Sequence, residues 1–284
     1  MGFQLARSDN KSEFVSNLNK ETANHIGAQK LSKVFLGGGG ENVLALSDVN
    51  LVIEEGTFVS LIGPSGCGKS TLLRILGGLD TPSTGQVFGC SDVITSSGRP
   101  LKSAFLFQEY GLFPWLSAID NVAFGLKMAK VPKAERIERS RAWLSRVGLS
   151  GFEKTYPEQL SGGMRQRLSL ARAFVTEPDV VFMDEPLGAV DPQTRLLLQE
   201  DLIRLWEETR KTVLLVTHSL DEALLLGDRV VVMTARPGRI KLDLKVDLPR
   251  PRNVAITSEV GFSELRTMLW DNLRDEVEQS LEFS

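Results

Sequence analysis

The sequence predicts an α/β fold with a helical segment inserted into it, and three observations lead to this prediction. Short apolar runs of strand length recur along the chain, and one of them, Thr57–Ile62, leads directly into a glycine-rich loop. A helical pattern follows that loop at Ser70–Leu79. Residues 110–175 then show helical rather than strand-like spacing of their apolar side chains. Strand and helix signals alternate again afterwards, which is typical of a layered α/β domain.

Length and composition set limits on the possible functions. With 284 residues, the chain approaches the size limit of one hydrophobic core, which favours one domain with an inserted lobe. The formal net charge of -3 argues against non-specific nucleic-acid binding, so we expect no nucleic-acid partner. The two cysteines, Cys67 and Cys90, provide no disulfide framework, which favours a reducing, cytosolic setting. Cys67 reads as a small packing residue rather than a nucleophile.

No segment predicts a membrane span. The longest apolar runs, such as Ala223–Leu226 and Val230–Met233, are far shorter than the roughly 20 residues that cross a bilayer. The N-terminus lacks the charged start and apolar stretch of a signal peptide. We therefore expect that the chain does not cross a membrane by itself.

The elements before the insertion follow from local patterns. Residues 1–28 are rich in Ser, Asn, Lys and Glu without a sustained period, which predicts a flexible N-terminal arm. Thr81–Gly85 has the composition of a turn. The expected strands are Leu31–Leu36, Leu44–Ile53, Thr57–Ile62 and Ala104–Phe107, with a loop at Gly37–Gly40.

The elements in and after the insertion follow similarly. Val180–Met183 is entirely apolar, as in a strand buried on both faces of a sheet. Asp191 and Pro192 predict the N-cap and first turn of a helix that reaches about Arg210. We place the main domain at residues 29–250, the helical insertion at about 110–175, and a C-terminal helical extension at 251–284. The other expected elements are helices Lys133–Val147, Arg165–Val175, Leu220–Leu226 and Phe262–Val277, strands Val213–Thr217 and Arg229–Thr234, and the surface strand Ile240–Leu248.

A phosphate-binding loop lies between the strand Thr57–Ile62 and the helix that follows. Its residues match the pattern G-x-x-x-x-G-K-[ST] at the required place. Glycines let backbone N–H groups approach a phosphate, and the helix N-terminus favours an anion. Lys69 adds a full charge, worth about 4 kcal/mol beside an anion at roughly 4 Å, and Ser70 is expected to ligate Mg²⁺. The residues expected to bind ATP here are Gly63, Pro64, Ser65, Gly66, Cys67, Gly68, Lys69, Ser70 and Thr71.

Polar residues follow three other predicted strands. Asp184 ends a hydrophobic strand, a usual place for a carboxylate that holds Mg²⁺ near the phosphate-loop hydroxyl. The next residue, Glu185, is expected to orient or deprotonate the attacking water. Gln108 is expected to contact Mg²⁺ and this water, and His218 to donate a hydrogen bond to the γ-phosphate. Taken alone, Gln108 and His218 would be interpreted as ordinary surface or structural residues. Their order along the chain and the presence of the other motifs favour catalytic roles.

The segment Leu160-Ser161-Gly162-Gly163-Met164-Arg165-Gln166-Arg167 decides the subclass. Ser161 reads as an N-cap, and the two glycines leave a bare helix N-terminus that an anion can approach. With these motifs in this order, residues 30–245 resemble the ATP-binding cassette (ABC) family. That resemblance implies an α/β fold with a P-loop NTPase core of ABC type, an inserted helical subdomain and an antiparallel β subdomain.

The resemblance also implies a working dimer. Ser161, Gly162 and Gly163 would contact the γ-phosphate of the ATP held by a second copy of the chain. Asp191, in the loop after Glu185, would reach across the dimer. Phe35 matches the aromatic residue that stacks on adenine, a position that often carries Tyr.

Two segments resemble those of importers for nitrate, sulfonates, taurine and related small solutes. They are residues 107–116, which contain Phe113 and Trp115, and residues 248–252, which contain Arg250 and Arg252. The first would line the groove that receives the permease; the alternative is core packing of the lobe. The alternative for the second segment is a solvated loop.

The expected function is therefore that of the ATP-hydrolysing subunit of an importer on the cytoplasmic face of the inner membrane. Its partners would be a second copy, integral membrane permease subunits and, indirectly, an external solute-binding protein. The alternatives are the ATPase subunit of an exporter and a non-transport ABC ATPase. Exporter ATPases are often fused to a membrane domain, and this sequence predicts no membrane span. The chromosome-maintenance relatives need a long coiled coil, but this sequence shows no sustained heptads.

Overall fold

A computed structural model describes residues 25–36, 42–89 and 101–282. Residues 1–24 of the predicted arm, the predicted Gly37–Gly40 loop and Cys90 lie outside this part of the chain. Strand β1 (Ile26–Leu36) begins inside the predicted arm, so the folded domain starts earlier than expected. The reason is main-chain pairing: Ile26 is fully buried and pairs with Ile53 of the next strand.

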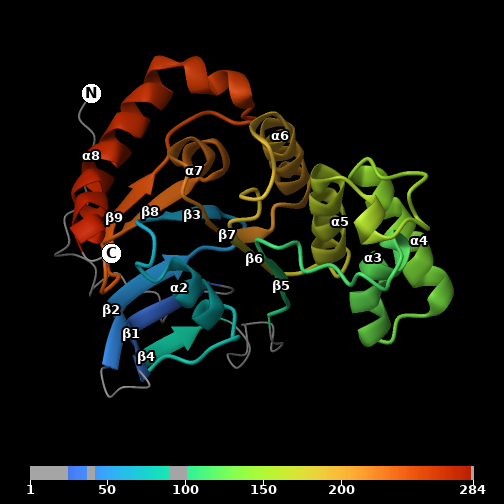
Figure 1. Cartoon of the computed structure of the whole chain (residues 1–284), viewed down its shortest axis with the longest axis horizontal. Coiled ribbons are helices and arrows are strands. Elements are labelled where there is room, and N and C mark those ends of the chain that lie inside the picture. The colour runs from blue at the N-terminus through green and yellow to red at the C-terminus, as the bar shows by residue number, and fades with distance from the viewer. Residues whose placement is uncertain (1–24, 37–41, 90–100, 283–284) are drawn as a thin grey trace.

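A six-stranded sheet forms the centre of the domain, in the order β5-β6-β7-β3-β8-β9 (Figure 1). Neighbouring strands are parallel except β8 and β9, which are antiparallel, so the predicted surface strand lies at one edge. The carboxyl ends of the parallel strands meet at one side of the sheet, where ligands usually bind in such folds. The strands are β3 (Phe58–Ile62), β5 (Ser103–Leu106), β6 (Val180–Asp184), β7 (Thr212–Val216), β8 (Arg229–Met233) and β9 (Ile240–Lys245).

A second, three-stranded antiparallel sheet has the order β2-β1-β4, with β2 at Asn42–Ile53 and β4 at Thr84–Phe88. It confirms the expected antiparallel β subdomain. The turn prediction for Thr81–Gly85 was partly wrong, because Thr84 and Gly85 belong to β4. Only Val87 and Phe88 are apolar in this edge strand, which leaves little strand signal. Gly85 has φ +81°, and the Lys30 carbonyl approaches so closely that no Cβ would fit.

Helices cover both faces of the central sheet. Helix α2 (Lys69–Leu76) lies between the two sheets, and α6 (Pro192–Thr209), α7 (Leu220–Leu226) and α8 (Val260–Glu282) cover the opposite face (Figure 1). The insertion forms a lobe of helices beside the sheet (Figure 1). These are α3 (Ala118–Met128), α4 (Lys133–Arg146) and α5 (Gly162–Phe174).

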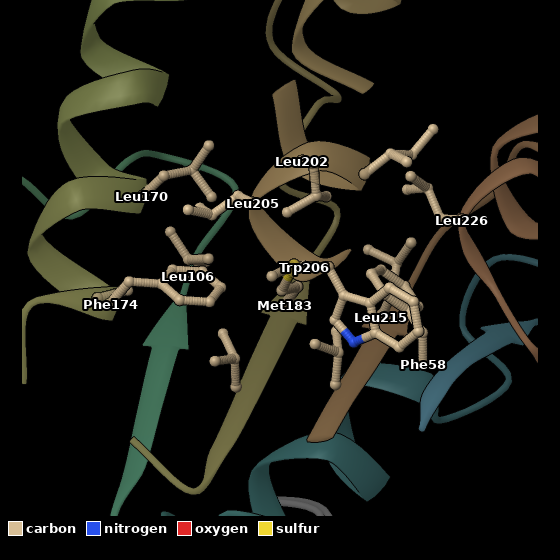
Figure 2. Packing of buried hydrophobic residues seen from close by; sticks show 14 of the residues in the cluster. Phe58, Leu106, Leu170, Phe174, Met183, Leu202, Leu205, Trp206, Leu215 and Leu226 are labelled. Atoms are coloured by element: carbon tan, nitrogen blue, oxygen red, sulfur yellow. The ribbon is translucent and has the colours of Figure 1, made fainter. Parts of the chain in front are cut away.

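The larger core cluster joins the sheet to α6, α7, α8 and the inserted lobe. Figure 2 shows its centre, where Trp206 of α6 packs on Phe58 of β3. The ring centroids are 5.9 Å apart in an edge-to-face arrangement, a geometry worth about 1 kcal/mol beyond burial. Leu170 and Phe174 of α5 reach the same cluster, so the lobe and the sheet share one apolar core.

The segment after β9 is fixed to the domain. The guanidinium of Arg252 is buried and donates to four backbone carbonyls, those of Leu224, Gly227, Val246 and Leu248. Arg250 donates to Asp228 and lies over the Trp206 ring, with 4.2 Å between the guanidinium carbon and the ring centroid. The solvated-loop alternative for these two arginines was therefore wrong. Of the helices in the described ranges, none combines the length and apolar character needed to span a membrane.

Candidate functional site

The phosphate loop connects β3 to α2 in the predicted position. Gly66 (φ +72°) and Gly68 (φ +104°) adopt left-handed backbone conformations that suit glycine. Gly68 leaves no room for a side chain either, because a Cβ there would lie 2.7 Å from Leu46 Cδ2. Residues 63–68 therefore form the tight turn that the motif requires, and α2 begins immediately after it at Lys69.

Lys69 is almost fully buried beneath this loop. Its Nζ donates to the carbonyl oxygens of Gly63 at 2.8 Å and Pro64 at 2.9 Å. Burial lowers the pKa of Lys69, while the thiol of Cys67 and the carboxylates of Glu185 and Asp184 oppose that shift. Cys67 is also buried, and burial raises the pKa of its thiol. A thiol with a raised pKa is a poor nucleophile, which supports its interpretation as a packing residue.

Ser70 and Asp184 meet at the carboxyl edge of the sheet. The Ser70 hydroxyl donates to Asp184 Oδ1 at 2.8 Å, although the two residues come from α2 and the end of β6. Mg²⁺ prefers oxygen ligands and usually takes only one or two from the protein beside substrate phosphates. The hydroxyl–carboxylate pair fits such an ion.

Gln108 stands apart from this pair. It is exposed after β5, and its Nε2 approaches Gly188, in the loop that follows Glu185. Among the described residues, no hydrogen bond joins Gln108 to Ser70 or Asp184. The structure thus brings Gln108 to the loop of the acidic pair but not into direct contact with the predicted metal ligands.

Glu185 and His218 form a close pair. His218 Nε2 lies 2.5 Å from Glu185 Oε1, and both side chains are partly exposed. The Glu185 backbone has φ +48°, an unusual value for a residue with a side chain, and its N–H donates to Val216 O on β7. Strained backbone conformations of this kind cost about 1–3 kcal/mol and concentrate at functional sites.

A cleft of about 270 Å³ opens above the phosphate loop. Phe35 lies in its wall, 42% exposed, with Lys33 Nζ 5.0 Å from the centre of its ring. Arg236, from the turn between β8 and β9, was not predicted to belong here, and no motif in the sequence marks it. The lining residues are Phe35, Val43, Ala45, Ser65, Gly66, Gly68, Lys69, Ser70, Thr71, Glu185, His218 and Arg236.

The signature segment begins α5. Ser161 is its N-cap, as predicted, and accepts a hydrogen bond from Met164 N at 3.3 Å. Gly163 packs against the start of α6, where a Cβ would lie 2.7 Å from Thr194 Cγ2. Asp191 caps α6 by accepting a hydrogen bond from Thr194 N at 3.0 Å. Hydrogen bonds from the side chain and the backbone of Thr194 lower the pKa of the Asp191 carboxyl. Neither the signature residues nor Asp191 line the cleft described above.

Comparison with known proteins agrees with these motifs. The family model for ABC transporters matches residues 46–188. An uncharacterized ABC transporter ATP-binding protein of Methanocaldococcus jannaschii is 47% identical over 253 residues, which cover 89% of this chain and 92% of that protein. The chain belongs to the ABC transporter family. This ABC protein is an ATP hydrolase of the type that couples hydrolysis to transmembrane transport.

Other relatives carry more specific names. The taurine import ATP-binding protein of Pelagibacter ubique is 40% identical over 88% of this ABC chain and 96% of its own length. An aliphatic sulfonates import ATP-binding protein of Bacillus cereus is 41% identical over 85% of this chain and 92% of its own.

Solved structures confirm the fold. A dimeric bacterial ABC transporter cassette superposes with a TM-score of 0.67 at 35% identity, covering 79% of this chain and all of that one. A dimeric post-hydrolysis cassette, bound to ADP and phosphate, gives the same TM-score at 34% identity. The ABC-type fold and the binding of ATP are thereby established for this chain.

Proposed function

We propose that this ABC ATPase drives the import of a small organic anion of the sulfonate or taurine class. It would do so as a homodimer attached to permease subunits, at the cytoplasmic face of the inner membrane. The observation that carries the homodimeric ATPase in this proposal is the separation of two phosphate-binding elements in one chain. The cleft contains the phosphate loop, Glu185 and His218, whereas the signature at Ser161 lies outside it.

A second copy accounts for this separation. A helix N-terminus with two glycines binds an anion well, but the signature does not line the cleft of its own chain. If two copies face each other, the signature of one can close over the cleft of the other. The dimeric arrangement of the related cassette supports this view. Ser161, Gly162, Gly163 and Asp191 would then complete the neighbour's site.

Within each cleft, the side chains divide the work of hydrolysis. Glu185 would accept a proton from water or orient it, and its carboxylate lies at hydrogen-bond distance from His218. Lys69 brings positive charge beneath the phosphates, and Phe35 offers an aromatic face to adenine.

Ser70 and Asp184 would hold Mg²⁺, which supplies neutralisation of the phosphate charge when it is bound. Gln108 would complete the ligand set from the loop beside Gly188. Positioning and charge neutralisation are the main requirements of phosphoryl transfer.

The inserted lobe offers a surface for the permease. Trp115 is 71% exposed, so the alternative that it packs in the core was wrong. Phe113 is half-buried, with its ring centroid 4.5 Å from that of Phe124, and the Arg172 guanidinium lies 5.3 Å from its centre. An exposed indole beside an anchored aromatic ring is typical of interface centres. This pattern favours a protein partner at residues 107–116.

The solute class rests on relatives. The names of two relatives refer to taurine and to aliphatic sulfonates, which supports import and a sulfonate-type anion more than nitrate. An external solute-binding protein would deliver the anion to the permease. An exporter subunit and a non-transport ABC ATPase are the competing proposals.

Reconstitution with the copurifying permease and binding protein tests the proposal. The assay would follow radiolabelled taurine, an alkanesulfonate and nitrate in proteoliposomes. We expect taurine or the sulfonate to accumulate, with ATP, on the side that carries the ATPase subunit. A complex with Glu185→Gln should show no accumulation. Movement of solute away from that side, or the absence of any copurifying membrane protein, would contradict the proposal.

A further inference from the structure

The turn between β8 and β9 reaches back to the phosphate loop. Arg236 lies in this turn, is exposed and lines the cleft. Its Nε and Nη2 donate to the carbonyl oxygen of Gly66, at 3.3 Å and 3.2 Å. A guanidinium has five N–H donors, so this contact leaves others available to a ligand. Of the described residues that line the cleft, Lys69 and Arg236 are the two whose side chains carry a permanent positive charge.

The C-terminal helix α8 holds the same turn from the other side. Glu276 is only 8% exposed, and its Oε2 accepts a hydrogen bond from Ala235 N at 2.8 Å. Its Oε1 forms an ion pair with Lys241 Nζ, also at 2.8 Å. The buried carboxylate therefore fixes the backbone directly before Arg236.

The remainder of the turn has little freedom. Gly238 N donates to Ala45 O at 2.9 Å, and Gly238 O accepts from Ser47 N at 3.0 Å. A Cβ on Gly238 would lie 2.1 Å from the Cys67 carbonyl oxygen, so the turn packs directly against the phosphate loop. Strand β2, the phosphate loop and α8 thus fix its position together.

We propose that Arg236 is a further nucleotide-binding residue, which contacts the phosphates of ATP, and that Glu276 is its positioning residue. A guanidinium suits phosphate because its planar set of donors matches the phosphate oxygens. From its position on the turn, Arg236 donates hydrogen bonds to Gly66 and also lines the cleft. The C-terminal extension thereby becomes part of the nucleotide site, although α8 itself lies beyond the matched family region of residues 46–188.

Arg236 is tested by separating binding from turnover. We expect Arg236→Gln to raise the KM for ATP roughly tenfold, the change that about 1.4 kcal/mol produces, and to reduce kcat much less. Affinity for a fluorescent N-methylanthraniloyl ATP should fall by a similar factor. Arg236→Lys should recover part of this loss, because it keeps the charge. The control is Arg239→Gln, an exposed arginine on the same turn with no side-chain contact to the phosphate loop among the described residues, and it should behave as wild type.

Glu276 is tested through its dependence on Arg236. Glu276→Ala should raise KM for ATP in the same way, and Glu276→Gln should recover most of the affinity because an amide oxygen can still accept from Ala235 N. Glu278→Ala, an exposed residue of the same helix, is the control. The double variant Arg236→Gln with Glu276→Ala should bind ATP no more weakly than Arg236→Gln alone. The reason is that each substitution removes the same contact, the one between Arg236 and the phosphates.

Two results would overturn the inference. One is unchanged KM and nucleotide affinity in Arg236→Gln. The other is an additive loss in the double variant, since Glu276 would then act by another route. The inference rests on the cleft being the nucleotide site, which Lys69→Ala tests separately: if that variant still binds the fluorescent nucleotide, the cleft assignment fails. All these assays use the ATPase subunit alone, so they do not depend on the transported solute.

Discussion

His218 Nε2 lies 2.5 Å from Glu185 Oε1, although one residue follows β7 and the other follows β6. The parallel pairing of these neighbouring strands, with Asp184 opposite Val216, brings the two loops together. The Glu185 backbone has a left-handed conformation, and its side chain contacts this partner. The imidazole therefore limits the freedom of the carboxylate that faces the cleft, as expected for a general base and the residue that orients it.

Glu185→Gln is expected to bind ATP but to hydrolyse it at least about a hundredfold more slowly, because an amide cannot accept the proton of the attacking water. The variant should accumulate as an ATP-bound dimer, seen by size-exclusion chromatography with light scattering. Glu200→Gln, an exposed position on α6, is the matched control and should hydrolyse ATP normally. Hydrolysis by Glu185→Gln at the wild-type rate would remove Glu185 from the role of base.

Ser161→Arg is expected to abolish hydrolysis while nucleotide binding by the subunit stays nearly intact. The reason is that Ser161 lies outside the cleft of its own chain and would act on the ATP of the second copy. The change also removes the N-cap of α5, which costs about 1 kcal/mol. Ser117→Arg removes the N-cap of α3 in the same lobe and serves as the control for that loss. Weakened nucleotide binding in Ser161→Arg but not in Ser117→Arg would contradict the shared site.

The chemistry at the ends of the parallel strands could be predicted from the sequence. The glycine loop, the acidic pair at Asp184 and Glu185, and His218 each follow an apolar run, and the carboxyl ends of parallel strands meet at one edge. Local patterns were sufficient there because each motif carries its own strand signal. Strand β4 was missed for the opposite reason, since its signal comes from pairing with β1 rather than from its own residues.

Arg236 and Glu276 could not be predicted, because their roles come from contacts between distant parts of the chain. Arg236 meets Gly66 across 170 positions, and Glu276 meets Ala235 across 41. Neither residue belongs to a repeated pattern. The same applies to Arg252, whose buried position depends on the arrangement of α7 and the segment after β9 around it.

Glu222→Gln is expected to stabilise the protein at alkaline pH. Burial raises the pKa of the Glu222 carboxyl above its ordinary value of 4.5, while hydrogen bonds from Thr217 and Gln199 and the charge of Arg195 oppose the shift. Because its pKa is raised in the folded state, the Glu222 carboxyl makes its full contribution to stability below pH 4.5. This contribution is lost as the pH rises through the folded-state pKa. The neutral amide does not lose it, so the Tm of the variant should exceed that of wild type at pH 8 by a few degrees.

The measurement is a series of thermal melts between pH 4.5 and pH 8. The advantage of Glu222→Gln should shrink toward the acidic end, where the wild-type carboxyl is protonated as well. Glu208→Gln, at an exposed position on α6, should show no such trend. An advantage that is equal at every pH would mean that ionisation of Glu222 does not limit stability.

Arg252→Met is expected to lower the free energy of unfolding by about 2–4 kcal/mol, because it leaves buried carbonyl groups without their donor. The four acceptors belong to α7, the turn after it and the segment after β9. The substitution would therefore also weaken the attachment of the segment that leads to α8. Burial and the neighbouring Arg250 lower the pKa of Arg252 to about 10. The guanidinium is thus still charged at neutral pH, and its loss removes charge-assisted hydrogen bonds.

Urea unfolding followed by fluorescence measures the effect of Arg252→Met, because Trp206 lies beside this region and Arg250 covers its ring. Arg252→Lys should also destabilise, since a single ammonium cannot reach four carbonyls. Arg274→Met, at an exposed position of α8, is the control and should leave the midpoint unchanged. A wild-type midpoint in Arg252→Met would show that the hydrogen bonds of Arg252 do not contribute to the stability of the domain.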